Sequence, residues 1–481
     1  MSEPTTPTRQ HLGLWDAVSI IVGIVVGAGI YETAPFILAN VSSPWMAMLV
    51  WGLGGLLSLV GALCYAELAT TYPQSGGDYV YLTRAFGPLV GFLFGWAQLT
   101  VILTASLGAM AFVFADYAVR LWDLQSPGTT SASSWAVLFA AGAVTLLSIF
   151  NVLGSVMGKR VQNLLTVAKI VGLTGVVIAG FGWGSAEGWS LPADASSGSF
   201  GLAMILVLYT FGGWNDAAFV AAEIRNPQRN IVRALVLGIA CITLIYLLVN
   251  AAYIWGLGFE RARNSAAIAA DTFGLSLGTW GAKAMCLLVI LSALGACNGL
   301  IFVGARIYSR LGADHVAFAK LAHWHPRLAA PIWSLVVQAA VTLVMLFLVG
   351  LPAGQQLVNQ LLQTLGLPVA AWAGHGGFET LVTCSAPVFW AFFLLTGISL
   401  FVLRKKDRDV PRPFTIPLYP WLPLLFCVMC AWMLYTSIKY IVDVQLLGAM
   451  LLLAVVPLLT GVMVYALSPR PEQTASIDQG R

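Results

Sequence analysis

The chain has 481 residues, of which 59% are hydrophobic and only 9% are charged, with 24 basic and 20 acidic side chains and a formal net charge of +4. A soluble domain carries about 25% charged residues, so this composition excludes a soluble protein and predicts a polytopic membrane protein. The near balance of the charges gives no reason to expect a nucleic-acid partner.

Long apolar segments follow one another along the chain. A bilayer core requires about 20 apolar residues in helix, and lipid cannot satisfy exposed backbone groups. The alternating pattern of strands is absent. We therefore predict an all-α fold with about twelve transmembrane helices, at residues 14–40, 43–70, 86–120, 134–152, 160–182, 200–224, 231–255, 277–306, 331–350, 382–403, 417–440 and 444–467.

The basic residues indicate how these segments are oriented. With the N-terminus inside, 18 of the 24 Lys and Arg residues fall in cytoplasmic segments. Basic residues concentrate on the cytoplasmic side of membrane proteins. We therefore predict that the tails at 1–13 and 468–481 are both cytoplasmic, and that the protein lies in the plasma (inner) membrane.

Two of the predicted helices contain clusters of glycine at mid-span. The segment Gly27-Ala28-Gly29 lies within 14–40, and Gly212-Gly213 lies within 200–224. Each glycine costs about 1 kcal/mol relative to alanine in a helix interior, so both helices are expected to unwind. The alternative is close helix packing through small residues.

The positions of the two clusters favour the unwound interpretation. The first helix begins a five-helix block at 14–182 and the sixth begins a second block at 200–403, while residues 417–467 form two further helices. Interrupted helices at corresponding positions of two halves indicate the binding site of a transporter.

An unwound helix exposes main-chain groups of both signs. The N–H groups of Ala28, Gly29 and Ile30, at the positive end of a half-helix, attract a carboxylate. The carbonyls before them, with others in helix 6, attract an ammonium group, so an α-amino acid fits. The candidate substrate-binding residues are Val25, Val26, Gly27, Ala28, Gly29, Ile30, Phe211, Gly212, Trp214 and Asn215.

These residues resemble the amino acid, polyamine and organocation (APC) transporter superfamily, and most closely its L-type amino acid transporter branch with its bacterial relatives. The resemblance covers most of the chain. It rests on Gly27-Ala28-Gly29-Ile30, on Glu67, Tyr72, Pro73, Gly76, Gly77, Tyr79, Val80, Tyr81, Arg84, Ala85, Phe86 and Gly87, on Phe211-Gly212-Gly213-Trp214-Asn215, and on Glu223, Asn226, Pro227, Arg229, Asn230 and Ala234.

The resemblance implies that helices 1 to 5 and 6 to 10 are inverted repeats and that transport occurs by alternating access. Ala28 and Gly29 would then meet the substrate carboxylate, and the carbonyls of Val25, Phe211 and Trp214 its ammonium group. The Phe211 ring would be the outer gate, with ordinary aromatic packing as the alternative.

Lys169 stands in the middle of the fifth predicted helix. A lysine at that depth costs roughly 2.5 to 3.5 kcal/mol and is by default a functional candidate, although it could also extend to the cytoplasmic surface. In sodium-independent relatives a helix 5 lysine takes the place of sodium and links helices 1, 5 and 8. The resemblance thus implies sodium-independent transport and leaves exchange and proton symport open.

Glu32 and Asp216 fall in the first turns that follow the two breaks. Each could complement the helix dipole, worth about 0.3 to 1 kcal/mol, or carry a proton, or contact a cationic substrate, so both join Lys169 as candidate coupling residues. We predict transport of neutral L-amino acids, with cationic amino acids or polyamines as the alternative.

Other functions and partners find little support in the sequence. It shows neither a zinc-binding His pair on a helix nor a glycine-flanked nucleophilic serine, so no enzyme, metal site or cofactor is predicted. The connection at 121–133 contains no cysteine, whereas light chains of heteromeric transporters use one there. No disulfide-linked heavy chain is therefore expected.

Overall fold

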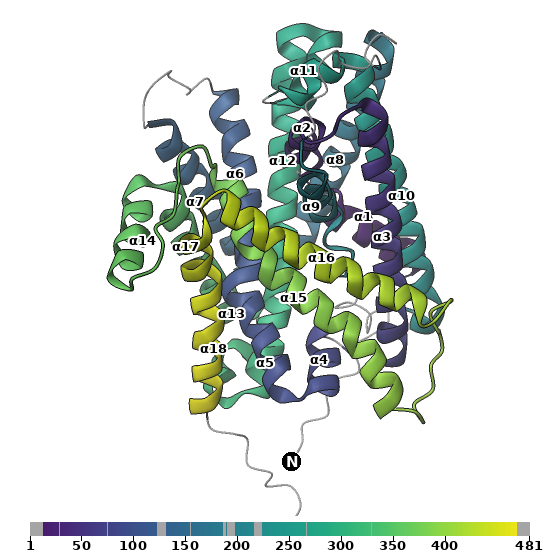
Figure 1. Ribbon diagram of the computed structural model, residues 1–481, viewed down its shortest axis with the longest axis vertical. Helices are drawn as coiled ribbons and strands as arrows, with labels where there is room; N and C mark the ends of the chain where they lie inside the picture. The colour runs from purple at the N-terminus through teal and green to yellow at the C-terminus, as the bar shows by residue number, and fades with distance from the viewer. Residues whose placement is uncertain are drawn as a thin grey trace, which may run out of the picture.

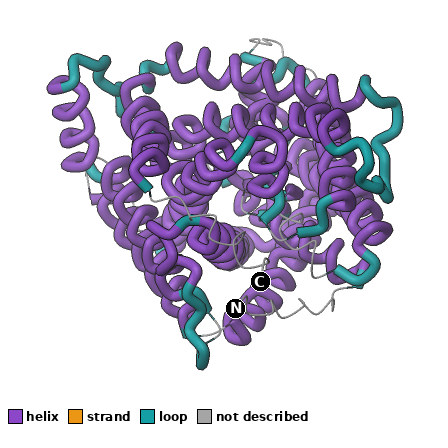
Figure 2. The backbone as a smooth tube through the Cα atoms, turned by 90° about the horizontal axis from the view of Figure 1, so that it is seen from below, coloured by secondary structure: helices purple, strands orange, loops and turns teal. Residues whose placement is uncertain are grey.

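The computed structural model describes residues 13–27, 29–74, 76–122, 131–153, 155–185, 189, 198–215, 224–265, 267–328 and 330–468. Over these residues the protein consists of helices and connecting loops, as Figure 2 shows, with an isolated bridge between His325 and Ala330. The prediction of an all-helical fold is therefore confirmed for the described part of the chain.

The helices of the first part are α1 (Leu14–Val25), α2 (Gly29–Ala39), α3 (Pro44–Thr71), α4 (Asp78–Phe86), α5 (Pro88–Ala97), the π-helix η1 (Gln98–Ile102), α6 (Leu103–Leu121), α7 (Ser131–Val152), α8 (Ser155–Trp183) and α9 (Phe200–Phe211). The helices of the second part are α10 (Pro227–Leu257), α11 (Phe259–Arg263), α12 (Ile268–Asp314), the 3₁₀ helix η4 (Val316–Ala322), α13 (Ile332–Gly350), α14 (Pro352–Thr364), α15 (Gly377–Lys406), α16 (Trp421–Asp443), α17 (Leu447–Met450), the π-helix η5 (Leu451–Val455) and α18 (Val456–Leu467).

Within the described residues, nine helices are long and apolar enough to cross a membrane. Two shorter apolar helical segments, Lys169–Trp183 within α8 and Phe200–Phe211, which is α9, lie in further predicted spans. The protein is therefore a multi-pass membrane protein, while the count of twelve spans stays a prediction.

Helix boundaries follow local capping chemistry. The Ser43 hydroxyl accepts the N–H of Met46 at 3.2 Å, and Pro44 occupies the first position of α3, where its missing N–H costs nothing. A different device ends α10: Gly258, which follows its last residue, has a φ of +81°, in the left-handed region that favours glycine.

The first predicted helix is interrupted where its glycines lie. α1 ends at Val25 and α2 begins at Gly29. In the sixth predicted helix, α9 ends at Phe211 and is followed by Gly213, whose φ of +99° requires glycine. Residues 216–223, where this helix is predicted to resume, lie outside the described residues.

The two halves of the first predicted helix and α9 lie together in the middle of the molecule (Figure 1). α2 packs on α9, and α1 packs on α10, which in turn lies along α3. Figure 1 shows α1, α2 and α9 between α12 on one side and the pair α3 and α10 on the other. The two predicted breaks are thereby brought to the same region.

Candidate binding site

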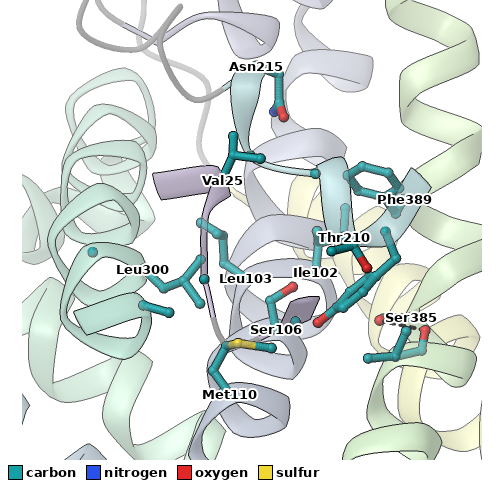
Figure 3. Close-up of a pocket in the computed structure, with 18 of the residues that line it drawn as sticks. Val25, Ile102, Leu103, Ser106, Met110, Thr210, Asn215, Leu300, Ser385 and Phe389 are labelled. Carbon is teal, nitrogen blue, oxygen red and sulfur yellow. Dashed lines mark hydrogen bonds between the residues drawn. The ribbon is translucent and has the colours of Figure 1, made fainter. Parts of the chain in front are cut away.

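A cavity of about 160 Å³ lies where the interrupted helices meet. Figure 3 shows several of its side chains pointing into this space from different helices. Five parts of the chain line it. They are Gly23, Val25, Gly27 and Gly29 of the first predicted helix (helix 1, containing α1 and α2), Gln98, Ile102, Leu103, Ser106 and Met110 of η1 and α6, Ile205, Tyr209, Thr210, Gly212, Gly213 and Asn215 of the sixth predicted helix (helix 6, containing α9), Gly295, Ala296, Gly299 and Leu300 of α12, and Val382, Ser385, Ala386, Phe389 and Trp390 of α15.

The described lining residues carry no charged side chain. Polar groups come from one amide pair, Gln98 and Asn215, and from four hydroxyl groups, while the remainder is glycine, aliphatic or aromatic. The Oε1 atom of Gln98 is buried and has no hydrogen-bond partner among the described residues. An apolar pocket with a few polar groups is typical of a site for a small molecule.

Main-chain groups from both halves of the first predicted helix also lie at the cavity. The first N–H groups of an α-helix have no partner within the helix, and they mark its positive end. Gly29, the first residue of α2, lines the cavity, as does Val25, the last residue of α1. The cavity wall thus offers both an anion-binding helix terminus and the carbonyl end of a half-helix.

Tyr246 of α10 joins the two breaks. Its hydroxyl group lies 2.9 Å from the carbonyl oxygen of Val25 and 3.0 Å from that of Thr210. The side chain is fully buried. This hydroxyl therefore holds the end of α1 against the end of α9.

A second link joins the other half of helix 1 to helix 6. The hydroxyl oxygens of Thr33 and Thr210 are 2.8 Å apart, and the Thr33 hydroxyl also contacts the carbonyl oxygen of Gly29 at 2.9 Å. Thr210 is consequently tied to both halves of helix 1, through its main chain and through its side chain.

The structure brings five of the predicted binding residues to the cavity, namely Val25, Gly27, Gly29, Gly212 and Asn215. Ile30 and Trp214 are buried but are not among its lining residues. Val26 lies instead on a separate apolar pocket between α1, α8 and α10. Ala28 falls outside the described residues, and so does Asp216.

Phe211, the predicted gate, does not line the cavity in this structure. Its ring is fully buried, with centroid distances of 5.1 Å to Tyr246 and 6.1 Å to Trp51. These are the contacts of the alternative, ordinary aromatic packing. A gating role for Phe211 stays a prediction that requires its ring to move.

Lys169 of α8 is 2% exposed, and its ammonium group donates a hydrogen bond of 3.1 Å to the carbonyl oxygen of Gly23. Gly23 belongs to α1 and also lines the cavity. In this structure the ammonium group thus points at helix 1 and stabilises a main-chain carbonyl close to the break, instead of extending to the membrane surface.

Glu32 lies in the first turn of α2 and is not one of the cavity-lining residues. Its electrostatic neighbours are Asp116 and Arg120 of α6. The carboxylate therefore faces a charged group on a neighbouring helix and is separate from the uncharged cavity.

Sequence reasoning missed most of the side chains at this site. Thr210 directly precedes the predicted motif of helix 6, so its position gave some signal. Tyr246 stands in a continuous apolar run, and Gln98, Ser106 and Ser385 lie on helices without any motif of their own. Only the packing of α10, η1, α6 and α15 around the breaks brings them to this region.

A multi-pass membrane protein with a helix interrupted at a central cavity has a feature typical of secondary transporters. The comparison with known proteins agrees with this class. Residues 12–461 match the amino acid permease family, and the chain therefore belongs to this family of the APC superfamily.

Curated relatives resemble the chain over most of its length. It is 28% identical over 440 residues to the b(0,+)-type amino acid transporter 1 of Mus musculus, covering 90% of this chain and 84% of that protein. It is 27% identical over 421 residues to the serine/threonine exchanger SteT of Bacillus subtilis, covering 87% and 88%. It is 30% identical over 440 residues to the large neutral amino acids transporter small subunit 2 of Oryctolagus cuniculus, covering 89% and 76%.

The family and these relatives are transporters and not enzymes. The resemblance to L-type amino acid transporters that the sequence motifs indicated is thereby confirmed. The finer assignments of substrate and mechanism depend on the site itself.

Proposed function

We propose that the protein is a secondary active transporter of neutral L-amino acids that works by alternating access, either as an exchanger or as a proton-linked symporter. The observation that carries this proposal is the cavity at the two breaks, whose described lining residues hold no charged side chain. A cationic or anionic side chain would be transferred there without a partner, which is costly.

The α-carboxylate and α-ammonium groups of the substrate are assigned to the main chain. The carboxylate would bind at the start of α2, near Gly29, where free N–H groups and the helix dipole attract an anion. The ammonium group would bind carbonyls near Val25 and at the end of α9. The substrate side chain would then face the apolar surface of Leu300, Phe389 and Trp390.

Sodium-independent transport is supported by Lys169. Its ammonium group already donates a hydrogen bond to the Gly23 carbonyl oxygen, next to the break of the first predicted helix. A fixed cation there disfavours the binding of a sodium ion nearby, because like charges repel strongly at low dielectric constant.

The names of the relatives support a range of amino acids. One is named as a transporter of large neutral amino acids, another as an exchanger of serine and threonine, and a third as a b(0,+)-type transporter. The alternative substrate class, cationic amino acids or polyamines, would require Glu32 or Asp216 to face the cavity.

We also propose the arrangement of the chain in the membrane. It consists of twelve helices, with inverted repeats at 14–182 and 200–403 followed by two helices at 417–467, in the plasma (inner) membrane with both termini in the cytoplasm. We further propose that no disulfide-linked heavy chain is needed, because residues 121–133 contain no cysteine.

Counterflow in proteoliposomes tests the function directly. Vesicles loaded with an unlabelled neutral amino acid should take up the labelled one in a saturable manner, with and without sodium, and lysine or putrescine should not replace it. Absence of counterflow with every amino acid would refute the proposal, and a strict requirement for sodium would refute the assignment of Lys169.

Glu32 distinguishes the two substrate classes. Because Glu32 does not line the cavity, we expect Glu32→Gln to leave counterflow of alanine or leucine within about twofold of the wild type. Glu260→Gln, at an exposed carboxylate of α11, is the matched control. A wild-type protein that transports cations and loses this activity selectively in Glu32→Gln would establish the alternative.

A further inference from the structure

Asp78 is a buried carboxylate at the junction of three helices. It is the first residue of α4, is 1% exposed, and lies between α3 and α15. The hydroxyl groups of Tyr65 and Thr396 both donate hydrogen bonds to its Oδ1 atom, the latter at 2.7 Å. The Oδ2 atom is buried and has no hydrogen-bond partner among the described residues.

The groups that face Asp78 do not compensate a negative charge. Tyr65 approaches from α3, Tyr81 from its own helix and Thr396 from α15, while Cys430 of α16 lies beside Tyr65. None of these groups is a cation, and no charged side chain interacts with the carboxyl among the described residues. Burial raises the pKa of Asp78 to about 6, although the two hydroxyl groups and the backbone N–H of Asp78, at the start of α4, oppose part of this rise.

Tyr65 connects this carboxyl to the substrate cavity. Its ring packs edge-on against Trp214, with a centroid distance of 5.1 Å, and both rings also contact Phe393. Trp214 stands directly after the Gly213 break of helix 6 and directly before Asn215, which lines the cavity. A displacement of Tyr65 would therefore be transmitted to the break through direct contact.

The helix that carries Thr396 also reaches the cavity. Ser385 and Phe389, both in α15, belong to its lining. Asp78 is thus connected to two walls of the cavity, to the end of the sixth predicted helix through Tyr65 and Trp214 and to α15 through Thr396.

Building on the function proposed above, we propose that Asp78 is the proton-binding group that makes transport dependent on pH, and that Tyr65 couples its charge state to the substrate site. A hydronium ion transfers its proton to the carboxylate, which gives a neutral carboxylic acid and water, and the reverse reaction returns the proton to water.

The direction of the effect follows from burial. The conformation seen here encloses Asp78 without a cationic partner, so it is favoured when the carboxyl is neutral. Because the buried group does not contact water, the proton enters or leaves only when α3 and α15 separate around it. Passage through this conformation, and with it the rate of uptake, should increase as the pH falls.

The experiment is amino acid uptake into proteoliposomes across a series of pH values that spans pH 6. For a single group, the protonated fraction falls roughly tenfold between one pH unit below and one unit above its pKa, and wild-type uptake should fall by a similar factor. Asp78→Asn, a permanently neutral isostere, should transport at the acidic wild-type rate over the whole series. Asp409→Asn, at an exposed carboxylate of the neighbouring connection, should retain the wild-type pH profile.

Two further variants test whether the Asp78 carboxyl is the group that sets the midpoint, and they remain informative if Asp78→Asn fails to fold. Tyr65→Phe and Thr396→Val each remove a hydrogen bond that favours the ionised carboxylate, so each should move the midpoint of the profile to higher pH. A wild-type profile without pH dependence, or an unchanged midpoint in these variants and in Asp78→Asn, would overturn the inference. Absence of wild-type counterflow at every pH would instead refute the transport function on which it rests.

Discussion

Two carboxylates are buried where α3 gives way to α4, and their surroundings differ completely. Glu67 accepts hydrogen bonds from Arg404 Nε at 2.7 Å and Nη2 at 2.5 Å, and from the N–H of Ile416 at 2.8 Å. Asp78 accepts hydrogen bonds from the hydroxyl groups of Tyr65 and Thr396, and it forms no ion pair among the described residues. Both carboxylates connect the α3–α4 region to α15, yet only one connection contains a cation.

The comparison shows that burial alone does not determine what a carboxylate does. The charge of a buried carboxylate is compensated by a bidentate arginine, and removing one partner leaves the other uncompensated. A buried carboxyl without a cation can gain or lose a proton at moderate pH instead. We therefore assign a structural role to Glu67 and a coupling role to Asp78.

The largest expected effect is the loss of stability in Glu67→Ala. This change leaves the Arg404 and Arg412 guanidinium groups without their carboxylate, and breaking a buried ion pair typically costs about 3 to 5 kcal/mol. Denaturant unfolding of the purified protein in detergent should show this decrease in the free energy of unfolding.

A double variant sharpens this prediction. Replacing both charges, as in Glu67→Met with Arg404→Leu, should cost clearly less than Glu67→Ala alone, since a buried pair can often be exchanged for apolar side chains. A loss below about 1 kcal/mol in Glu67→Ala would show that the pair contributes like an exposed one.

Asp78→Asn is expected to have a smaller effect of opposite sign. The pKa of Asp78 is raised in the folded protein. The carboxyl therefore contributes most to the free energy of unfolding below the unfolded pKa of about 4, and this contribution is lost as the pH rises through about 6. Above that pH the neutral asparagine should therefore stabilise the protein by on the order of 1 to 2 kcal/mol relative to the wild type. The pH dependence of unfolding in both proteins measures this difference, and a destabilised variant at alkaline pH would contradict it.

Much of the architecture is local in origin and could be predicted from the sequence. The break of helix 1 follows from glycines that are close neighbours in the chain, and α9 ends beside Gly212 and Gly213 for the same reason. The apolar runs predicted most of the helices, because length and hydropathy are local properties.

The contacts that define the site are not local, and for this reason they escaped prediction. Asp78 meets Thr396 and Glu67 meets Arg404 across more than 300 residues of chain. Tyr246 reaches the Val25 carbonyl from a helix with an unremarkable apolar sequence. Even the Phe211 motif, which is recognisable in the sequence, does not reveal that its ring packs on Trp51.

A third carboxylate, Asp407, extends the comparison to the protein surface and should show the smallest effect. The hydrogen bond from Arg84, followed by that from the Tyr72 hydroxyl, holds the pKa of Asp407 below its usual value. The Arg84 side chain is 43% exposed, so the pair is screened by water and should contribute at most about 1 kcal/mol.

The sign of this contribution is opposite to that of Asp78. A lowered pKa in the folded protein means that the stabilisation is present above the unfolded pKa of about 4 and is lost as the pH falls through the folded value. Asp407→Asn should therefore be slightly less stable than the wild type at neutral pH and equal to it in acid, and high salt should reduce the difference. A difference that persists in acid or resists salt would mean that Asp407 acts as a buried ion-pair partner, as Glu67 does. Solvent exposure would then not explain why the two carboxylates differ.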